Sequence, residues 1–201
     1  MRRFVRGWKM LGHEQRLDAR IVNYADDFVI LTRPGRACEA MATMRGMMER
    51  LRLTVNETKT RVCRLPDETF DFLGYTFGRH TSWYTGRAYL GPKPSKKKIG
   101  RICDEIGAVT DRCGTWHEAE EIVGQLNAKL RGWSNYFRVG TVVQAYEVVM
   151  GHARRRLRRW LCVKHKVRRG EYARFPNEYL HGKLGLYQLP RTTRGLLCAK
   201  P

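Results

Sequence analysis

Residues 20–31 have the sequence RIVNYADDFVIL, in which β-branched and aromatic residues flank the acidic pair Asp26-Asp27. Such runs on both sides of a short polar turn predict two antiparallel strands joined as a hairpin. The two carboxylates would then lie at the hairpin tip. Adjacent carboxylates repel each other when both are ionised, and a divalent cation relieves that repulsion. The pair therefore has two interpretations, a Mg²⁺ site or an ordinary exposed turn, in which Asp is also favoured.

The segments after this hairpin alternate between helical and strand patterns. Apolar residues between Ala37 and Leu51 recur at spacings of three and four, which predicts an amphipathic helix that covers the hairpin. Residues 70–77 (FDFLGYTF) predict another short strand, and residues 83–90 (WYTGRAYL) predict a hairpin that turns near Gly86. The first part of the chain thus combines strands with at least one helix.

The second part of the chain favours helices. Residues 91–98 (GPKPSKKK) are rich in Pro and Lys and lack bulky apolar side chains, which indicates a domain boundary. Residues 99–109 predict one helix, a capping box of Thr115 and Glu118 predicts the start of a second, and apolar residues between Val142 and Leu161 predict a third. We therefore expect an α+β fold with domains at residues 1–91 and 92–201.

The composition points to a partner rich in phosphate. The 201 residues include 39 Lys and Arg against 19 Asp and Glu, a formal net charge of +20. Since 42% of residues are apolar, the chain can bury a core. We find neither an apolar run long enough to span a membrane nor a signal peptide, and we expect a cytoplasmic protein. The six scattered cysteines are expected to be reduced, and Cys162 with His165 lacks the second pair that a structural zinc needs.

The strongest basic run lies between residues 154 and 169. It contains nine Lys or Arg and no Asp or Glu. On a helix, Arg154, Arg155, Arg158 and Arg159 would share one side, while Leu157 and Leu161 would face the core. A solvated helix face usually mixes both signs of charge, so this run predicts contact with nucleic-acid phosphates.

Four motifs in order resemble the reverse transcriptases encoded by group II introns. Tyr24-Ala25-Asp26-Asp27 is similar to the family's catalytic YADD hairpin. Residues 51–60 resemble the next motif, with Lys59 at the position of its lysine, and residues 72–75 (FLGY) resemble the primer-grip strand. Residues 126–137 (LNAKLRGWSNYF) resemble the signature of the group II intron maturase-specific domain, and residues 160–166 are similar to a later helix of that domain.

The resemblance implies a partial reverse-transcriptase palm at residues 1–91, followed by a helical thumb and maturase domain at residues 92–201. It implies Mg²⁺-dependent, RNA-directed DNA polymerisation and binding of intron RNA that assists splicing, with intron RNA, a DNA primer and an RNA template as partners. The implied catalytic residues are Asp26, Asp27 and Lys59, with both aspartates as metal ligands. Phe72, Leu73, Gly74 and Tyr75 would form the primer grip. The residues expected to contact RNA are Lys96, Lys97, Lys98, Arg131, Trp133, Tyr136, Arg154, Arg155, Arg158, Arg159, Lys164, Lys166, Arg168 and Arg169.

The same resemblance leaves the expected Mg²⁺ site incomplete. The family's first catalytic Asp and its Gly-Gly loop have no counterpart before Tyr24. Asp18 would lie roughly 25 Å from the hairpin tip along a strand, too far to share a metal ion with Asp26. We therefore expect no polymerisation by this chain alone, unless a separate polypeptide or a second subunit supplies the missing half. The alternatives are a non-enzymatic maturase protein that binds intron RNA, and an inactive remnant with exposed apolar surface.

Overall fold

The computed structural model describes residues 1–81 and 86–190. These residues form an α+β structure with two small antiparallel sheets, β1-β2 and β3-β4-β5, as the sequence predicts. The chain divides into two compact units, Met1–Phe72 and Leu73–Pro201. The expected boundary after residue 91 rests on the composition of residues 91–98 and on the family resemblance, and it stays a prediction.

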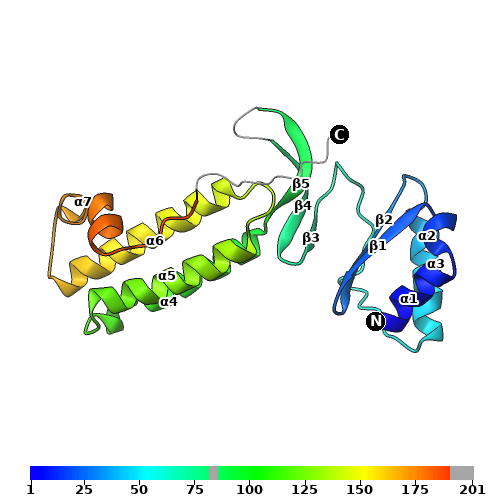
Figure 1. Ribbon diagram of the computed structural model, residues 1–201, viewed down its shortest axis with the longest axis horizontal. Helices are drawn as coiled ribbons and strands as arrows, with labels where there is room; N and C mark the ends of the chain where they lie inside the picture. Colours follow the sequence, from blue (N-terminus) through cyan, green and yellow to red (C-terminus); the bar gives the residue numbers. More distant parts are fainter. Residues whose placement is uncertain (82–85, 191–201) are drawn as a thin grey trace. The chain divides into compact units, whose positions relative to one another are not determined.

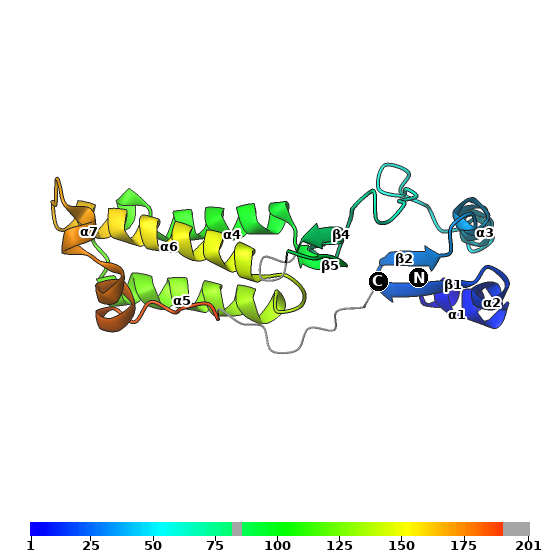
Figure 2. The same cartoon turned by 90° about the horizontal axis from the view of Figure 1, so that it is seen from above.

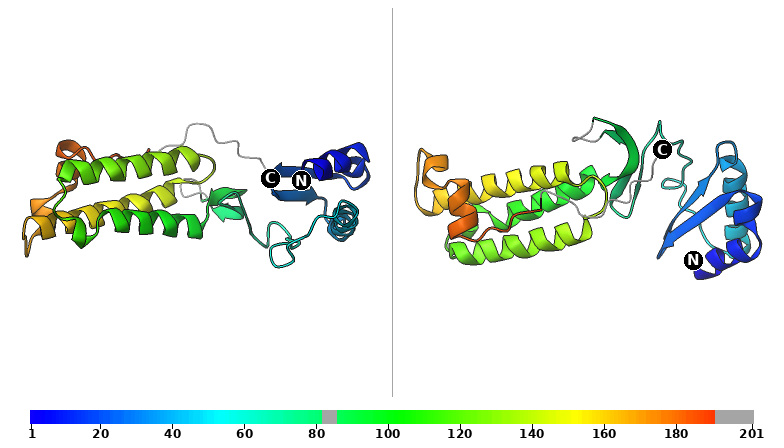
Figure 3. Two further views of the ribbon diagram at one scale, coloured as in Figure 1. Left: turned by 90° about the horizontal axis from the view of Figure 1, so that it is seen from below. Right: turned by 45° about the horizontal axis from the view of Figure 1, so that its top comes forward.

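The first unit packs helices against the predicted hairpin. Strands β1 (Ala19–Tyr24) and β2 (Asp27–Thr32) pair from Ala19 opposite Thr32 to Tyr24 opposite Asp27. Helix α3 (Ala37–Arg50) confirms the predicted amphipathic helix and buries Met44 and Met48 with hairpin residues. Helices α1 (Arg2–Met10) and the short α2 (His13–Arg16) were not predicted from the sequence. Helices α1 and α3 lie on the same side of the hairpin (Figure 1 and Figure 3).

The predicted single strand over residues 70–77 is wrong, because the structure contains two strands there. Strand β3 (Phe70–Phe72) ends before Leu73 and Gly74, whose φ angles are 52° and 78°, and β4 (Tyr75–Thr81) follows. Two consecutive residues with positive φ form the type of turn that reverses a tight hairpin. In the predicted hairpin at residues 83–90, residues 83–85 lie outside the described part of the chain.

Residues 91–98, where the composition predicts a domain boundary, belong largely to a strand and a helix. Strand β5 (Ala88–Pro94) pairs with β4 from Thr81 opposite Ala88 to Tyr75 opposite Pro94. Helix α4 (Lys96–Val109) begins after Ser95, whose hydroxyl accepts a hydrogen bond from the Lys98 backbone N–H. One residue, Ser95, therefore connects the last strand, β5, to helix α4.

Three long helices run side by side in the second unit (Figure 1 and Figure 2). These are α4, α5 (Ala119–Tyr136) and α6 (Val143–Lys164), and their apolar faces bury Ile106, Leu126 and Leu157 in one core. Shorter elements complete the unit: the 3₁₀ turn η1 (Arg112–Gly114), helix α7 (Glu171–Arg174) and the π-helical turn η2 (Tyr179–Lys183). The three predicted helices are confirmed.

The predicted capping box is wrong, although the helix whose start it predicted is present as α5. Helix α5 has Glu118 as its N-cap, three residues after Thr115, and the Thr115 hydroxyl donates to the Arg112 carbonyl of η1. The Thr115 hydroxyl, which the capping-box pattern assigned to the start of α5, is therefore used in a local hydrogen bond of the preceding turn.

The cysteines and the helices bear on two further expectations. Among the described residues, Cys38, Cys63, Cys103, Cys113 and Cys162 are free thiols, while Cys198 lies outside them. None of the helices in residues 1–81 and 86–190 is both long and apolar enough to cross a membrane.

Candidate nucleic-acid interface

The two predicted metal ligands lie at the tip of the β1-β2 hairpin. Ala25 (φ 50°) and Asp26 form the turn, and Asp27 is the first residue of β2, opposite Tyr24. Both carboxylates are exposed. Asp18 lies beyond the other end of the hairpin, where its Oδ2 is 2.6 Å from the Arg33 Nε. The tip therefore offers two adjacent carboxylates, and the described residues include no cluster of three or more potential metal ligands.

Lys59 lies in the irregular segment between α3 and β3. Its backbone N–H donates to the Asn56 carbonyl at 3.1 Å, and its side chain is exposed. In the part of the chain that the structure describes, it forms no ion pair with either tip aspartate. Its expected role beside nucleotide phosphates stays a prediction.

The predicted primer-grip residues meet the C-terminal end of α5. The Tyr75 hydroxyl donates to the Tyr136 carbonyl at 2.8 Å, and the Tyr136 hydroxyl donates to the Leu73 carbonyl at 2.9 Å. The two rings stack with centroids 6.3 Å apart. The Gly74 carbonyl accepts from the Ser95 N–H at 2.9 Å. Hydrogen bonds thus connect Leu73, Gly74 and Tyr75 to α5 and to the residue that begins α4. Phe72 is half-buried in β3.

A pocket of about 270 Å³ between α4 and α5 brings together three predicted RNA contacts, Lys98, Trp133 and Tyr136. Glu105 lies in this pocket, where hydrogen bonds from Lys129 and then Arg101 lower the pKa of its carboxyl. Arg101 and Lys129 were not predicted from the sequence, because their positions in the helices did not show that both would reach the Glu105 carboxylate. The full lining is Lys98, Arg101, Ile102, Glu105, Lys129, Trp133, Tyr136 and Phe137.

Trp133 is half-buried and packs against the helical core rather than lying exposed at the surface. Its ring lies 5.0 Å from the Phe137 ring and 5.7 Å from the Tyr146 ring, against the helical core. Arg131 and Tyr136, on the same helix, are exposed, as are Lys96 and Lys97 at the start of α4. Of the two aromatic residues predicted to contact RNA, Tyr136 is the more accessible.

The four α6 arginines that were predicted to share one exposed side do not do so, which corrects the predicted arrangement. Arg155 and Arg159 are exposed and Arg154 is half-buried, but Arg158 is only 3% exposed. The Arg158 Nε donates to the Phe175 carbonyl at 2.8 Å, and its Nη2 donates to the Asn177 Oδ1 at 2.9 Å. Residues 171–177 return over this part of α6, which local helix geometry could not reveal. Arg158 therefore holds the fold together at this point.

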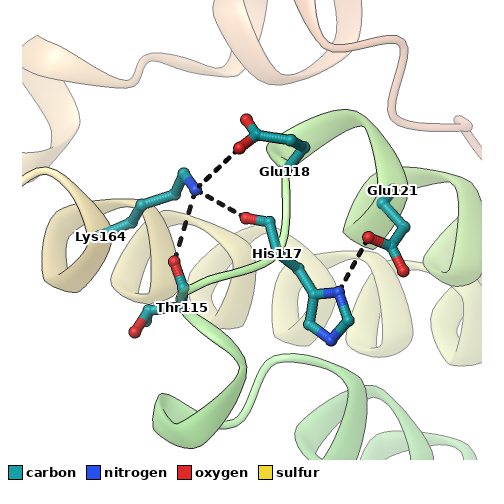
Figure 4. Close-up of polar contacts among 5 residues, drawn as sticks. All are labelled: Thr115, His117, Glu118, Glu121 and Lys164. Carbon is teal, nitrogen blue, oxygen red and sulfur yellow. Dashed lines mark hydrogen bonds and ion pairs between the residues drawn. The ribbon is translucent and has the colours of Figure 1, made fainter.

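Lys164 also binds the chain's own groups, as Figure 4 shows. Its Nζ donates to the His117 carbonyl at 2.6 Å and to the Thr115 carbonyl at 3.4 Å, and it lies 3.7 Å from the Glu118 carboxylate. His117 Nδ1 in turn lies 2.8 Å from the Glu121 Oε2. Lys164 thus ties the end of α6 to the loop before α5.

Within residues 154–169, five of the predicted basic residues are exposed and make no ion pair among the described residues. We call them the α6 basic set, which consists of two residues on α6 and three that follow its end: Arg155, Arg159, Lys166, Arg168 and Arg169. Buried and half-buried cations beneath them, Arg158 and Lys164, already have protein partners. The set therefore presents guanidinium and ammonium groups that are free to contact phosphates.

Comparison with known proteins identifies the segment that carries this set. Residues 99–176 match the family model described as "Group II intron, maturase-specific domain". The match runs from α4 through α7 and includes the whole α6 basic set. No curated protein matches the chain.

Proposed function

We propose, from the premise that residues 99–176 are a group II intron maturase-specific domain, that this chain binds group II intron RNA and assists its splicing. The match indicates a maturase function and supports assignment to the C-terminal region of a group II intron maturase and reverse transcriptase. The details of RNA binding are our proposal.

The observation that carries the proposal is the exposed α6 basic set within the matched segment. RNA phosphates attract exposed Lys and Arg, and their neutralisation releases counterions, which favours binding. The net charge of +20 adds long-range attraction. Because ligand binding stabilises the state that binds, a chain that contacts only the folded intron would favour that fold and thereby splicing.

Salt dependence of RNA binding tests the proposal. The affinity for a group II intron transcript is measured at several salt concentrations for the chain and for an Arg155→Gln/Arg159→Gln variant. We expect weaker binding and a salt slope smaller by about 0.7–0.9 for each phosphate that the variant no longer neutralises. The matched control, Arg50→Gln/Arg52→Gln, removes two exposed charges from the first unit and should change the slope less. Equal effects of the two variants would contradict the assignment to α6.

We also propose that the hairpin tip is the remnant of a Mg²⁺ site for RNA-directed DNA polymerisation. Asp26 and Asp27 are adjacent, exposed oxygen donors, the ligand type that Mg²⁺ prefers. Bound there, Mg²⁺ would neutralise charge on nucleotide phosphates. A separate reverse-transcriptase half or a second subunit would supply a further carboxylate. Asp26, which lies in the turn itself, is the first ligand to test.

Primer extension tests this second proposal. The chain is incubated with Mg²⁺, nucleotides and a DNA primer on an RNA template, with Asp26→Asn as the control. Extension that Asp26→Asn abolishes would support the polymerase proposal. If the chain alone shows no extension, its Mg²⁺ site is incomplete as expected, and RNA binding or an inactive remnant is left. If Asp26→Asn extends the primer as well as the wild-type chain does, the site as proposed is wrong.

A further inference from the structure

A pocket of about 200 Å³ lies between α6 and α7. Three arginines of α6 line it, together with the first two residues of α7: Arg155, Arg158, Arg159, Glu171 and Tyr172. Drug-sized molecules and whole cofactors usually occupy about 300–1,000 Å³. This pocket is therefore suited to a part of a larger ligand rather than to a complete cofactor.

The aromatic wall of the pocket is held in place while its ring remains accessible. Tyr172 is 58% exposed. The Arg158 guanidinium carbon lies 4.1 Å from the ring centroid, over one face of the ring. Because Arg158 is buried and bonded to Phe175 and Asn177, it supports this face rigidly. A ring held in this way loses little conformational freedom when a ligand stacks on it.

The charges at the pocket favour an anion that also carries hydrogen-bond donors. Arg155 and Arg159 are exposed one helical turn apart, and neither forms an ion pair within residues 1–81 and 86–190. Glu171 is the single carboxylate in the lining. Two free arginines suit a phosphate, whereas a carboxylate suits the amino and imino N–H groups on a base edge.

We propose that this pocket receives one unpaired nucleotide of the bound RNA. Its base would stack on the accessible face of Tyr172, and its phosphate would contact Arg155 and Arg159. Glu171 would accept hydrogen bonds from the adjacent imino and amino N–H groups of a guanine. RNA-binding proteins commonly recognise splayed bases by such stacking and edge contacts. The inference rests on the proposed RNA-binding function and adds a base-specific contact to it.

Single-stranded and duplex RNA oligonucleotides of equal length test the proposal. Their affinities for the full chain are measured by fluorescence anisotropy, with Tyr172→Leu to remove the stacking surface and Tyr172→Phe to retain it. We expect Tyr172→Leu to weaken single-strand binding about tenfold and Tyr172→Phe to change it little. Duplex binding and the salt slope should not change, because no charge is removed. Trp116→Leu, which removes another exposed ring of the second unit, is the matched control.

Further measurements distinguish the nucleotide pocket from the RNA-binding function on which it rests. Glu171→Gln should lower the ratio of the affinity for G-containing strands to the affinity for poly(A), because guanine presents two adjacent N–H donors to the carboxylate and adenine presents one amino group. If Tyr172→Leu leaves single-strand affinity unchanged while Arg155→Gln/Arg159→Gln weakens all RNA binding, the pocket is wrong and the proposed function stands. If free GMP or CMP binds as tightly as the oligonucleotides, the pocket is a mononucleotide site and the inference is overturned. If the chain binds no RNA, both proposals are wrong.

Discussion

Arg155 and Arg158 are three positions apart on α6, yet the structure gives them opposite environments. Arg155 is exposed, whereas Arg158 is buried and donates to Phe175 and Asn177. Replacing a buried, hydrogen-bonded cation leaves its acceptors without partners, which is costly. An exposed arginine makes few contacts that unfolding would break.

We therefore predict opposite effects of two similar substitutions. Arg158→Gln should lower the free energy of unfolding by about 2–3 kcal/mol, because the Phe175 carbonyl and the Asn177 amide lose their charged donor. Arg155→Gln should change it by less than about 0.5 kcal/mol but weaken RNA binding. Urea unfolding and RNA titration of both variants check this pair. A stable Arg158→Gln variant would show that the buried hydrogen bonds contribute little.

Tyr146 makes the stability of the second unit depend on alkaline pH. Its hydroxyl donates to the Phe137 carbonyl at 2.6 Å and to the Ser134 carbonyl at 3.1 Å. Burial first, and then the neighbouring Tyr75 and Tyr187 hydroxyls, raise its pKa to about 12. Since the ordinary value is about 10, the folded chain holds this proton more tightly than the unfolded chain does.

The stabilisation from this proton is complete below about pH 10 and is lost as the pH rises through 12. We predict that the free energy of unfolding falls with pH more steeply for the wild-type chain than for Tyr146→Phe in this window. Urea unfolding at several pH values, with tyrosinate absorbance followed in parallel, measures the difference. Identical slopes would mean that Tyr146 does not titrate differently in the folded state.

Local sequence patterns predicted the first hairpin and the helices α3, α4, α5 and α6, but not α1 or α2. The spacing of Met44, Met47 and Met48 requires a helix with one apolar face, and α3 buries that face. The predicted strand over residues 70–77 was wrong because its apolar residues continue through Leu73 and Gly74, where the backbone turns. Pattern alone could not show that both residues take positive φ.

The candidate site was predictable only in part, for a similar reason. The basic run of α6 was visible in the sequence, but which cations are free depends on segments distant in the chain. Residues 171–177 cover Arg158, and the backbone carbonyls of Thr115 and His117 accept hydrogen bonds from the Lys164 ammonium group. Tyr172 gave no periodic or charge signal, so it was not predicted from the sequence.

Substitution of Gly74 tests how strongly the backbone of the β3-β4 turn is constrained. Gly74 has φ of 78°, and a Cβ there would lie 3.1 Å from the Lys98 Cε and 3.3 Å from the Phe137 Cζ. We predict that Gly74→Ala lowers the free energy of unfolding by about 1–2 kcal/mol, mainly through the positive φ. The matched control is Gly100→Ala within α4, where a Cβ meets nothing within 4 Å, and it should raise stability by up to about 1 kcal/mol. Thermal unfolding of both variants measures the difference. Equal stabilities of the two variants would mean that the positive φ at Gly74 constrains the turn little.

The two proposed functions belong to separate units of the chain. The α6 basic set belongs to the second unit and the tip aspartates belong to the first. Asp26→Asn/Asp27→Asn removes two negative charges, so we predict that intron RNA binding is unchanged or stronger. Filter binding compares this variant with the wild-type chain. A clear loss of affinity would place the hairpin tip within the RNA-binding surface.

If the α6 basic set supports maturase function, protein-dependent splicing should depend on it. A group II intron transcript is incubated at a Mg²⁺ concentration too low for it to splice unaided, with the wild-type chain, Arg155→Gln/Arg159→Gln or Asp26→Asn. We predict that the wild-type chain and Asp26→Asn restore splicing and that the double arginine variant does so poorly. Full splicing with the arginine variant, or dependence on Asp26 alone, would contradict the claim.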